Sequence, residues 1–468
     1  MLEQVLVKLK NKRIVVLGAG LTGMSCVRFL AKHQLSCIVN DSRVNPINSA
    51  EFSQQFPANK LVLGQWDESI ISQAEVIFAS PGIDLDEENI SALISPQCVL
   101  LGDVELFCQL TDKPMIAVTG SNGKSTVVSL LAHVGQGLGL NVSLGGNIGE
   151  PVLDQLADEV DCYVLELSSF QLETLTSMSA VAATVLNVSD DHLDRHKSIA
   201  NYSAIKQKVY AQCHVAVINR DDLLSFSTLG DSVQEKSASE SPALANKHII
   251  SFGSDQALPG NFGLLSQGEQ LFLSFGQEPL VKVHELPLAG MHNALNYLAV
   301  LALGYAAGWS IAEMLKQFSS FSGLPHRCQR IETKDNIHWI NDSKATNVGA
   351  ALAAINGLAP TLSRENKLIL VAGGDGKGAD FSPLQEVLSK HVGYVFTIGK
   401  DGHLISALCQ HSKQVADLPT AVKQANELAK SGDIVLLSPA CASLDMFTNF
   451  AERGQVFTDA VLALQEAS

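Results

Sequence analysis

The chain has 468 residues, of which 46% are hydrophobic and 17% are charged, and its formal net charge is −16. A chain of this length folds as about three domains of ~150 residues each, and its apolar content excludes a disordered protein. The negative charge argues against nucleic acid or an anionic membrane as a partner, because both need a basic surface. Small anionic substrates remain open, since a local basic patch is enough to bind them.

The cysteines and the first residues predict a cytoplasmic protein. Nine cysteines are scattered without a C-x-x-C pair, which is typical of free thiols in a reducing compartment rather than of disulfides or structural zinc. Residues 1–12 lack the apolar core of a signal peptide. No uninterrupted apolar run reaches the ~18 residues that span a bilayer, so we expect no membrane insertion, and we expect a monomer.

Residues 1–102 predict a Rossmann-like α/β domain, with strands at 13–17, 37–41, 61–63 and 76–79. The loop after the first strand contains Gly18-x-Gly20-x-x-Gly23, and Asp41 ends the second strand. By pattern this is a dinucleotide-binding fingerprint, so an NAD(P)-dependent redox enzyme is one alternative. Against it, Arg43 follows Asp41 closely and could take a phosphate. The loop indicates a bound nucleotide or pyrophosphate without saying which.

Residues 103–323 predict a central domain with a mostly parallel sheet of the P-loop ATPase type. Its strands are expected at 115–118, 142–144, 163–167, 182–186 and 215–218. Short β-segments at 249–252, 271–275 and 280–283 follow, and then a long buried helix at 293–307. The polar tract at 228–247 reads as a surface insertion.

The segment Thr119-Gly120-Ser121-Asn122-Gly123-Lys124-Ser125-Thr126 lies between an apolar strand and a helical pattern. Its glycines let backbone N–H groups point at phosphate oxygens, and the helix N-terminus adds positive potential. Lys124 supplies a charge for the outer phosphates, and Ser125 or Thr126 a hydroxyl for Mg²⁺. The loop is two residues shorter than the common P-loop, but its context predicts a nucleoside triphosphate site.

Polar residues also follow neighbouring strands of this sheet. Glu166 stands in an apolar strand, where a carboxylate must be paired or metal-bound, and an acidic residue there usually serves Mg²⁺. His192 follows the strand at 182–186 and could bind metal or substrate. Asn219-Arg220-Asp221-Asp222 approximates the base-reading motif of GTPases, so a GTP-driven switch is a second alternative. The arginine and the short P-loop argue against that class.

Residues 324–468 predict a second Rossmann-like α/β domain, with strands at 337–340, 368–371, 394–398 and 434–437. Polar clusters follow these strands at 341–344, 373–378, 399–402 and 438–443, where open α/β sheets bind ligands. Lys344, Lys377 and Arg327 lie in or near such loops. Together they predict a site for carboxylates or phosphates.

In combination, these motifs resemble the Mur ligase family of ATP-dependent amide-bond-forming enzymes. The resemblance rests on the short P-loop and on the segments 145–149, 166–173, 191–195, 341–347 and 438–445, and it spans all three domains. It is strongest to the branch that adds D-glutamate to UDP-N-acetylmuramoyl-L-alanine in peptidoglycan precursor synthesis. The Asp-Asn-Pro-Arg motif of the diaminopimelate- or lysine-adding branch is absent, and Ser42 stands where threonine is expected.

The resemblance implies a reaction through an acyl phosphate, driven by ATP with two Mg²⁺ ions. It implies that the UDP part lies against Leu21, Thr22, Ser42 and Arg43, and the muramoyl-alanine end against Asn147 and His192. ATP would contact Gly120, Ser121, Asn122, Gly123, Lys124, Ser125, Thr126, Asn293, Asn296, Arg327 and Asp342. D-Glutamate would contact Lys344, Lys377, Ser443, Leu444 and Phe450. Metal binding would involve Ser125, Glu166, His192 and Lys206, the last carbamylated by CO₂. The implied catalytic residues are Lys124, Glu166, His192 and Lys206.

Overall fold

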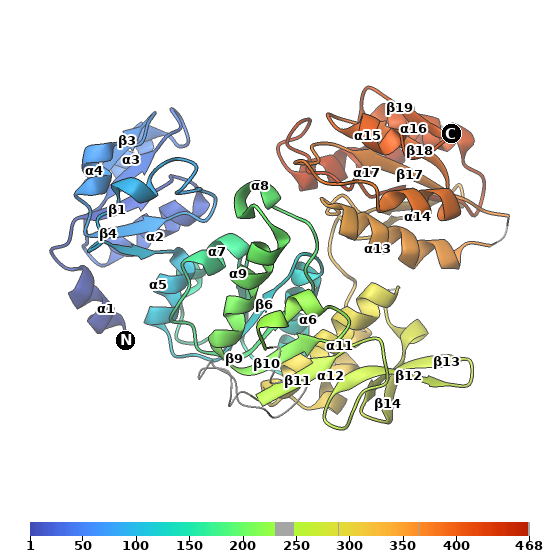
Figure 1. The fold of residues 1–468 in the computed structure, drawn as a ribbon, viewed down its shortest axis with the longest axis horizontal. Coiled ribbons are helices and arrows are strands. Elements are labelled where there is room, and N and C mark those ends of the chain that lie inside the picture. The colour runs from blue at the N-terminus through green and yellow to red at the C-terminus, as the bar shows by residue number, and fades with distance from the viewer. Residues whose placement is uncertain (230–247, 289, 364, 467–468) are drawn as a thin grey trace.

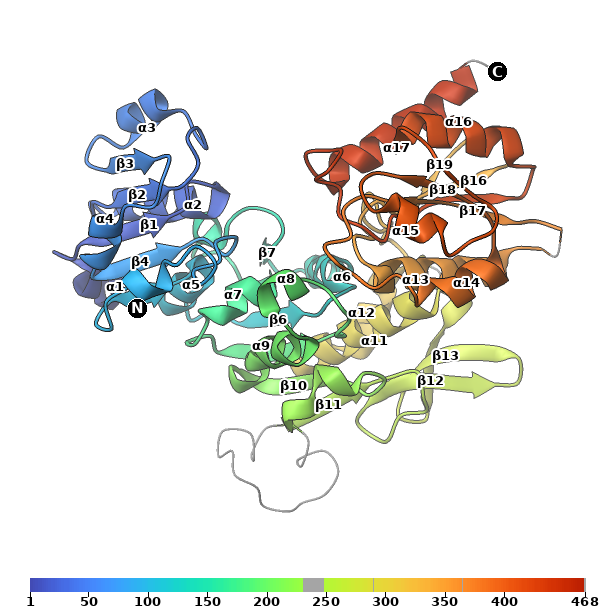
Figure 2. The same cartoon turned by 45° about the horizontal axis from the view of Figure 1, so that its top comes forward.

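The computed structural model describes residues 1–229, 248–288, 290–363 and 365–466. Three α/β bodies follow one another along the chain, and the first and third lie on opposite sides of the second (Figures 1 and 2). All but the first two residues of the polar tract at 228–247 fall outside the described residues. Every strand expected from the sequence is present, with ends shifted by at most two residues.

The first body is a parallel five-stranded sheet with the strand order β3-β2-β1-β4-β5. The order reverses between β1 and β4, and the Gly18–Gly23 loop follows β1 at this switch point, where open α/β sheets bind their ligands. Its strands are β1 Ile14–Leu17, β2 Ile38–Asp41, β3 Lys60–Leu63, β4 Val76–Ala79 and β5 Val99–Leu101. Its helices are α1 Leu2–Leu9, α2 Leu21–Lys32, α3 Ser49–Gln55 and α4 Glu68–Ser72. Helix α5 Asp103–Leu110 joins this body to the central one and contacts α1, α2 and the central segment Val152–Gln155.

The central sheet is parallel, with the order β11-β10-β9-β6-β8-β7. Its strands are β6 Met115–Thr119, β7 Val142–Gly146, β8 Cys162–Glu166, β9 Ala180–Val185, β10 Cys213–Asn219 and β11 His248–Phe252. The helices are α6 Lys124–Gly137, α7 Ser169–Glu173, α8 Leu193–His196, α9 Ile199–Ala211, α11 Met291–Ala306 and α12 Ile311–Phe318. An antiparallel sheet of β12 Phe262–Gln267, β13 Gln270–Phe275 and β14 Glu278–Lys282 follows.

The central sheet is covered by a hydrophobic core on each face. Strand β6 is accordingly apolar at every position except its last. Met115 and Ala117 face one hydrophobic core, and Ile116 and Val118 face the other. Helix α9 contacts β6, β9 and β10, while α11 contacts α6 and three of the strands. Since β6 lies between β8 and β9, the ends of those two strands flank the P-loop.

The third body is a six-stranded sheet with the order β15-β16-β20-β17-β18-β19, parallel except for β15. Its strands are β15 Gln329–Ile331, β16 His338–Asn341, β17 Leu368–Gly373, β18 Val392–Ile398, β19 Ser412–Gln414 and β20 Ile434–Leu437. The helices are α13 Val348–Leu358, α14 Leu384–His391, α15 Gly402–Ser406, α16 Leu418–Leu428 and α17 Phe450–Glu466. The strands β5, β12, β15 and β19 were not predicted from the sequence.

All nine cysteines are free thiols, as the spacing predicted. Within the described ranges, no helix combines the length and apolar content needed to cross a membrane.

Candidate active site

The P-loop between β6 and α6 depends on two glycines. Gly120 and Gly123 have φ angles of +147° and +84°, which favour glycine. A Cβ atom at Gly123 would lie 2.7 Å from Oδ1 of Asn296, so a side chain there would also push α11 away. The P-loop backbone therefore lies close to Asn296 of α11, one of the residues that the family resemblance assigned to ATP.

The segment after β9 holds the loop from the other side. The backbone N–H of Asn122 donates to Oδ1 of Asn187 over 2.8 Å, and Nδ2 of Asn187 donates to the carbonyl oxygen of Asn122 over 3.0 Å. The N–H of Ser189 donates to Oγ of Ser121 over 2.9 Å. These contacts fix the tip of the P-loop against the strand end that carries His192.

Two lysines meet under the loop. Nζ of Lys124 donates to the carbonyl oxygens of Gly120 and Ser121 over 2.6 and 2.8 Å, and burial lowers its pKa. Lys206, from α9, is only 1% exposed, and its Nζ donates to the same Gly120 oxygen over 2.9 Å. Burial, and then the charge of Lys124, lower the pKa of Lys206 well below its usual value. The amine of Lys206 is thus held at the phosphate loop in surroundings that disfavour its charge.

Glu166, at the end of β8, is buried and only half satisfied. Its Oε1 accepts a hydrogen bond of 2.7 Å from Nδ2 of Asn147, while Oε2 is buried without a partner. The pairing of Glu166 with Val118 sets it beside the start of the P-loop. A buried carboxylate oxygen with no partner is costly, and a hard cation would satisfy it. The charge of Glu166 also acts to raise the pKa values of Lys124 and Arg327, so pairing with these buried cations stays an alternative.

His192 has a left-handed backbone, with φ of 53°. Its ring lies edge-on to Phe170, at 4.9 Å between centroids. Burial lowers its pKa, and the nearby charge of Lys377 acts in the same direction. A neutral imidazole is the form that binds metal or accepts a proton. In the same segment, Arg195 stacks on Phe170 and donates to the carbonyl oxygen of Pro81 over 3.3 Å, which ties this segment to the first body.

The third body contacts the P-loop directly. Nη2 of Arg327 donates to Oγ of Ser125 over 2.7 Å. Asn347, which caps α13, donates from Nδ2 to Oδ1 of Asn122 and to Oδ2 of Asp191, over 3.1 and 3.3 Å. In the described structure the third body therefore contacts the P-loop. Its Arg327 binds the hydroxyl of Ser125, which is expected to serve Mg²⁺.

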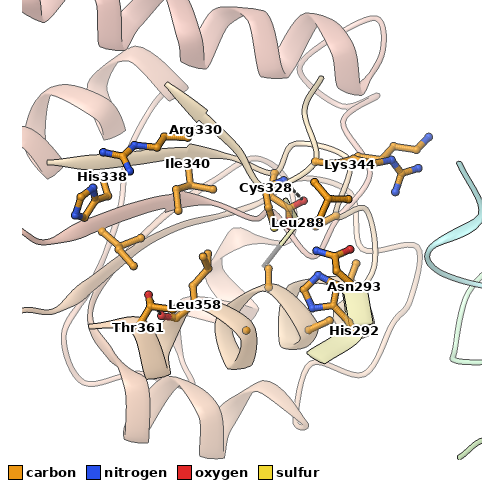
Figure 3. A pocket seen from close by; sticks show the side chains of 18 of the residues that line it. Leu288, His292, Asn293, Cys328, Arg330, His338, Ile340, Lys344, Leu358 and Thr361 are labelled. Carbon is orange, nitrogen blue, oxygen red and sulfur yellow. Dashed lines mark hydrogen bonds between the residues drawn. The ribbon is translucent and has the colours of Figure 1, made fainter. Parts of the chain in front are cut away.

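A cavity of about 720 Å³, which we call the P-loop cavity, lies between α11, α13 and the P-loop. Figure 3 shows Lys344 and Asn293 at one end and Arg330, His338 and Thr361 at the other. The residues expected at ATP that line it are Asn122, Gly123, Thr126, Asn293, Asn296, Arg327 and Asp342. Burial raises the pKa of Asp342 to about 6, although Oγ of Ser438 donates to it over 2.9 Å.

Only some of the residues expected to bind D-glutamate lie close to one another. Nζ of Lys344 lies 3.8 Å from the ring centre of Phe450, and Ser443 is buried in the loop after β20. Lys377 is exposed, with φ of +51°, and the side chain of Leu444 is 70% exposed. The structure therefore brings Lys344 and Phe450 together and leaves Lys377 and Leu444 at the surface.

A second cavity, of about 710 Å³, opens at the Gly18–Gly23 loop. Leu21, Thr22, Ser42 and Arg43 line it from the first body, and Asn147 and Phe170 line it from the central one. Through the contact between Asn147 and Glu166, this Gly18–Gly23 cavity reaches the residues beside the P-loop.

Asp41 contradicts the dinucleotide alternative. One of its oxygens accepts from the N–H of Ala19 over 2.7 Å, and Arg43 donates to both oxygens, over 3.0 and 2.7 Å. A dinucleotide site needs this carboxylate for a ribose hydroxyl, and here internal partners occupy it.

The GTPase alternative fails in a similar way. Arg220 pairs with Asp255 and donates to Oγ of Ser251 over 2.8 Å and to the carbonyl oxygen of Phe262 over 3.1 Å. These bonds join β10 to the segments around β11 and β12. The motif is a structural connection rather than a base-reading loop.

No three His, Cys, Asp or Glu side chains converge on a common point in the part of the chain that the structure describes. A pre-formed metal cage is therefore not found there. Mg²⁺ at nucleotide sites uses one or two carboxylates plus phosphate oxygens and water, so Glu166 with Ser125 fits such an ion without a cage.

Two residues of the site were missed from the sequence. Asn347 precedes a helical pattern, which signals a helix cap but not a contact with the P-loop. Arg453 lies buried under the loops that carry Lys344 and Ser443. A single arginine in a helix carries no sequence signal for such a place.

Known proteins match the chain along nearly its whole length. The profile of the MurD-like N-terminal domain of Mur ligases matches residues 12–102, that of the Mur ligase middle domain residues 118–304, and that of the Mur ligase glutamate ligase domain residues 326–441. The UDP-N-acetylmuramoylalanine–D-glutamate ligase of Colwellia psychrerythraea is 53% identical over 98% of each chain. That of Pseudomonas savastanoi is 42% identical over 96% of this chain and 98% of its own.

Solved structures share the fold at low identity. The pseudomurein peptide ligase type C of Methanothermus fervidus matches 97% of this chain and 100% of its own, at 19% identity and a TM-score of 0.60. The MurF ligase of Thermotoga maritima in complex with ADP matches 92% of this chain and 95% of its own, at 16% identity and a TM-score of 0.63. With three profiles and a relative at 53% identity in agreement, the chain belongs to the Mur ligase family.

Proposed function

We propose that the protein is an ATP-dependent ligase that joins D-glutamate to UDP-N-acetylmuramoyl-L-alanine in peptidoglycan precursor synthesis. The observation that carries the proposal is the 53% identity, over 98% of both chains, to a ligase named for this reaction. The geometry supports it, because the P-loop lines one cavity, of about 720 Å³, and Asn147, which donates to Glu166 beside the P-loop, lines the other, of about 710 Å³. One cavity suits a UDP-linked acid and the other suits ATP.

The reaction follows from the weak reactivity of a carboxylate. Oxide is a very poor leaving group, so the γ-phosphoryl group of ATP is first transferred to the L-alanyl carboxylate, and ADP is released. The amine of D-glutamate then attacks the acyl carbon, forms a C–N bond and loses a proton. The C–O bond between the acyl carbon and the phosphate breaks, and phosphate leaves with the electron pair. Lys124 would stabilise charge on the transferred phosphoryl group. The backbone N–H groups of Asn122 and Gly123 would surround the same group.

Mg²⁺ would neutralise phosphate charge during transfer, and we propose two ions. The unpartnered Oε2 of Glu166 fits one of them, with Ser125 as a second ligand. His192 and Lys206 are proposed for the second ion. Arg327 donates to Oγ of Ser125, so it must move to free that oxygen as a ligand.

We propose that Lys206 acts as a carbamate. Its pKa is lowered mainly by burial, and the neutral amine is the form that attacks CO₂. The nitrogen forms a bond to carbon and loses a proton, which yields an anionic carbamate. This group would suit both Mg²⁺ and the adjacent Lys124.

The substrate contacts and the organisation of the chain are proposals of the same kind. The UDP part would lie on Leu21, Thr22, Ser42 and Arg43, and the two carboxylates of D-glutamate on Lys344 and Lys377, with Ser443, Leu444 and Phe450 around them. We propose domains of residues 1–102, 103–323 and 324–468, acting as a cytoplasmic monomer.

The test is the mass of the product. The protein is incubated with ATP, Mg²⁺ and UDP-N-acetylmuramoyl-L-alanine, with D-glutamate, L-glutamate, D-aspartate or L-lysine in separate reactions. We expect ADP, phosphate and a product heavier by one glutamyl unit only with D-glutamate. A product with another amino acid would contradict the proposed substrate, and hydride transfer from NADH or NADPH would contradict a ligase altogether.

A further inference from the structure

Among the described residues, Arg453 in α17 is the largest fully buried side chain that carries a charge, with 0% exposure. Its guanidinium donates along two directions. Nε and Nη2 reach Oγ and the carbonyl oxygen of Ser343 over 3.0 and 2.8 Å, and Nη1 reaches the carbonyl oxygens of Cys441 and Ala442 over 3.1 and 3.2 Å. All of these acceptors are uncharged.

No carboxylate of the described residues lies within ion-pair distance of Arg453. Burial lowers the pKa of Arg453 to about 10, so the group still carries its charge near pH 7. A buried cation held only by neutral acceptors is expensive. The charges of Asp445 and Asp342 favour the charged form of Arg453 only from beyond ion-pair distance, so helix packing alone does not explain a buried cation at this position.

The two loops that Arg453 joins are those of the proposed amino-acid site. Ser343 stands between Asp342 and Lys344 after β16, and Cys441 and Ala442 lead to Ser443 after β20. The fork of the guanidinium therefore sets the separation between the loop that carries Lys344 and the loop that carries Ser443.

The first turn of α17 makes further contacts to the same region. Oγ of Ser343 donates to the carbonyl oxygen of Phe450 over 2.7 Å, and Nδ2 of Asn341 donates to that of Gly454 over 2.8 Å. The ring of Phe450 lies under Nζ of Lys344. The turn of α17 that carries Arg453 therefore also contacts Lys344, through the ring of Phe450.

We propose that Arg453 is a positioning residue for the amino-acid substrate, which holds the loops of Lys344 and Ser443 at the spacing that a dicarboxylate needs. The inference rests on the proposed D-glutamate site. Arg453 itself does not touch the substrate in this account; it acts through the two loops.

Three variants and a matched control test this. Arg453→Lys keeps the charge but cannot reach both loops, Arg453→Met removes charge and fork, and Ser343→Ala removes one acceptor. Val461→Ala is the control, because Val461 is equally buried in α17 but lies about two helical turns beyond Arg453. Thermal unfolding of each variant measures the purely structural cost.

In steady-state assays of the full-length enzyme, we expect Arg453→Lys to raise the KM for D-glutamate roughly tenfold or more, because small misplacements of binding groups are costly. The KM for the UDP substrate should change by less than about twofold. The KM for ATP should rise less than that for D-glutamate, because only Asp342, next to Ser343, is expected at ATP in these loops. Ser343→Ala combined with Arg453→Lys should be less than multiplicative, since both act on one contact. If Arg453→Lys lowers the melting temperature as Val461→Ala does and leaves the KM for D-glutamate unchanged, the residue is structural and the inference is wrong.

Amide hydrogen exchange gives a readout that does not depend on the reaction. We expect segments 341–346 and 440–444 to exchange faster in the Arg453 variants than in Val461→Ala, with the central sheet unchanged. Equal exchange in these segments would overturn the inference even if the wild-type enzyme uses D-glutamate. Faster exchange in a protein that rejects D-glutamate would instead contradict the proposed function and leave Arg453 as the residue that spaces the loops.

Discussion

Lys124 and Lys206 donate to the same carbonyl oxygen, that of Gly120, over 2.6 and 2.9 Å. Two ammonium groups on one acceptor repel each other, and the charge of Lys124 is one of the causes that lower the pKa of Lys206. Converting one amine into an anion would turn this repulsion into attraction. The first prediction follows from this pair.

We expect Lys206→Ala to lose most activity, and a small carboxylate such as acetate to restore part of it by taking the place of the carbamate. Lys208→Ala is the matched control, because Lys208 lies two residues away on α9 and is exposed. Its activity should stay near the wild-type value. Full activity of Lys206→Ala without added carboxylate would remove this residue from the site.

Glu166 supports a second prediction. Its unpartnered Oε2 is the atom proposed for Mg²⁺, so Glu166→Gln should keep the fold and the contact with Asn147 but lower kcat roughly a hundredfold or more. The Mg²⁺ concentration for half-maximal activity should rise as well. The exposed Glu159→Gln, near the start of β8, is the control and should change neither quantity. A loss of activity with an unchanged Mg²⁺ requirement would mean that Glu166 does not serve the metal.

The fold was largely predictable, because apolar strands and Gly-rich turns are local signals. The positions of the P-loop and of Glu166 at strand ends follow from such signals and from the rule that ligands gather at the carboxyl ends of parallel strands. The order of the strands around β6 was not predicted. The sequence could not predict which partner each polar side chain binds. Asp41 matched a ribose-binding carboxylate, but Ala19 and Arg43 occupy it. Arg453 contacts a loop that lies 110 residues away in the chain, and no local pattern encodes that contact.

Lys344 should make dicarboxylate binding depend on pH. Burial, with the charge of Arg327, lowers its pKa to about 8. Below pH 8 the ammonium is charged and can pair with a carboxylate; above it, binding must first take up a proton, so the Kd rises by about tenfold for each pH unit. Glutarate is a suitable probe, because it has two carboxylates and no amine that titrates.

For wild type we expect a Kd for glutarate that is flat to pH 7 and rises above pH 8, and for Lys344→Arg a Kd that stays flat to pH 9. Lys344→Ala should raise the KM for D-glutamate far more than that for ATP, by roughly ten- to a hundredfold for a lost charge-assisted bond of 1.5–3 kcal/mol. The exposed Lys390→Ala should have no effect. A raised KM for ATP with an unchanged KM for D-glutamate would mean that Lys344, which lines the P-loop cavity, serves ATP rather than D-glutamate.

The last prediction concerns stability rather than catalysis. Asp103, the first residue of α5, is buried, and its Oδ1 has no hydrogen-bond partner. Burial raises its pKa to about 6, against about 3.9 in an unfolded chain. The folded state therefore binds the proton more tightly, and the stability that the neutral carboxyl gives below pH 4 is lost as the pH rises through 6.

Asp103→Asn is neutral at every pH and avoids this loss. Relative to wild type, the variant should gain stability between pH 4 and pH 6, up to about 2–3 kcal/mol, and keep a constant advantage above pH 6. Melting temperatures measured from pH 4.5 to 7.5 follow the effect, and the exposed Asp112→Asn serves as the control with no such trend. A difference between Asp103→Asn and wild type that does not change with pH would show that Asp103 is ionised in the folded protein across this range, so that an unseen partner must stabilise its charge.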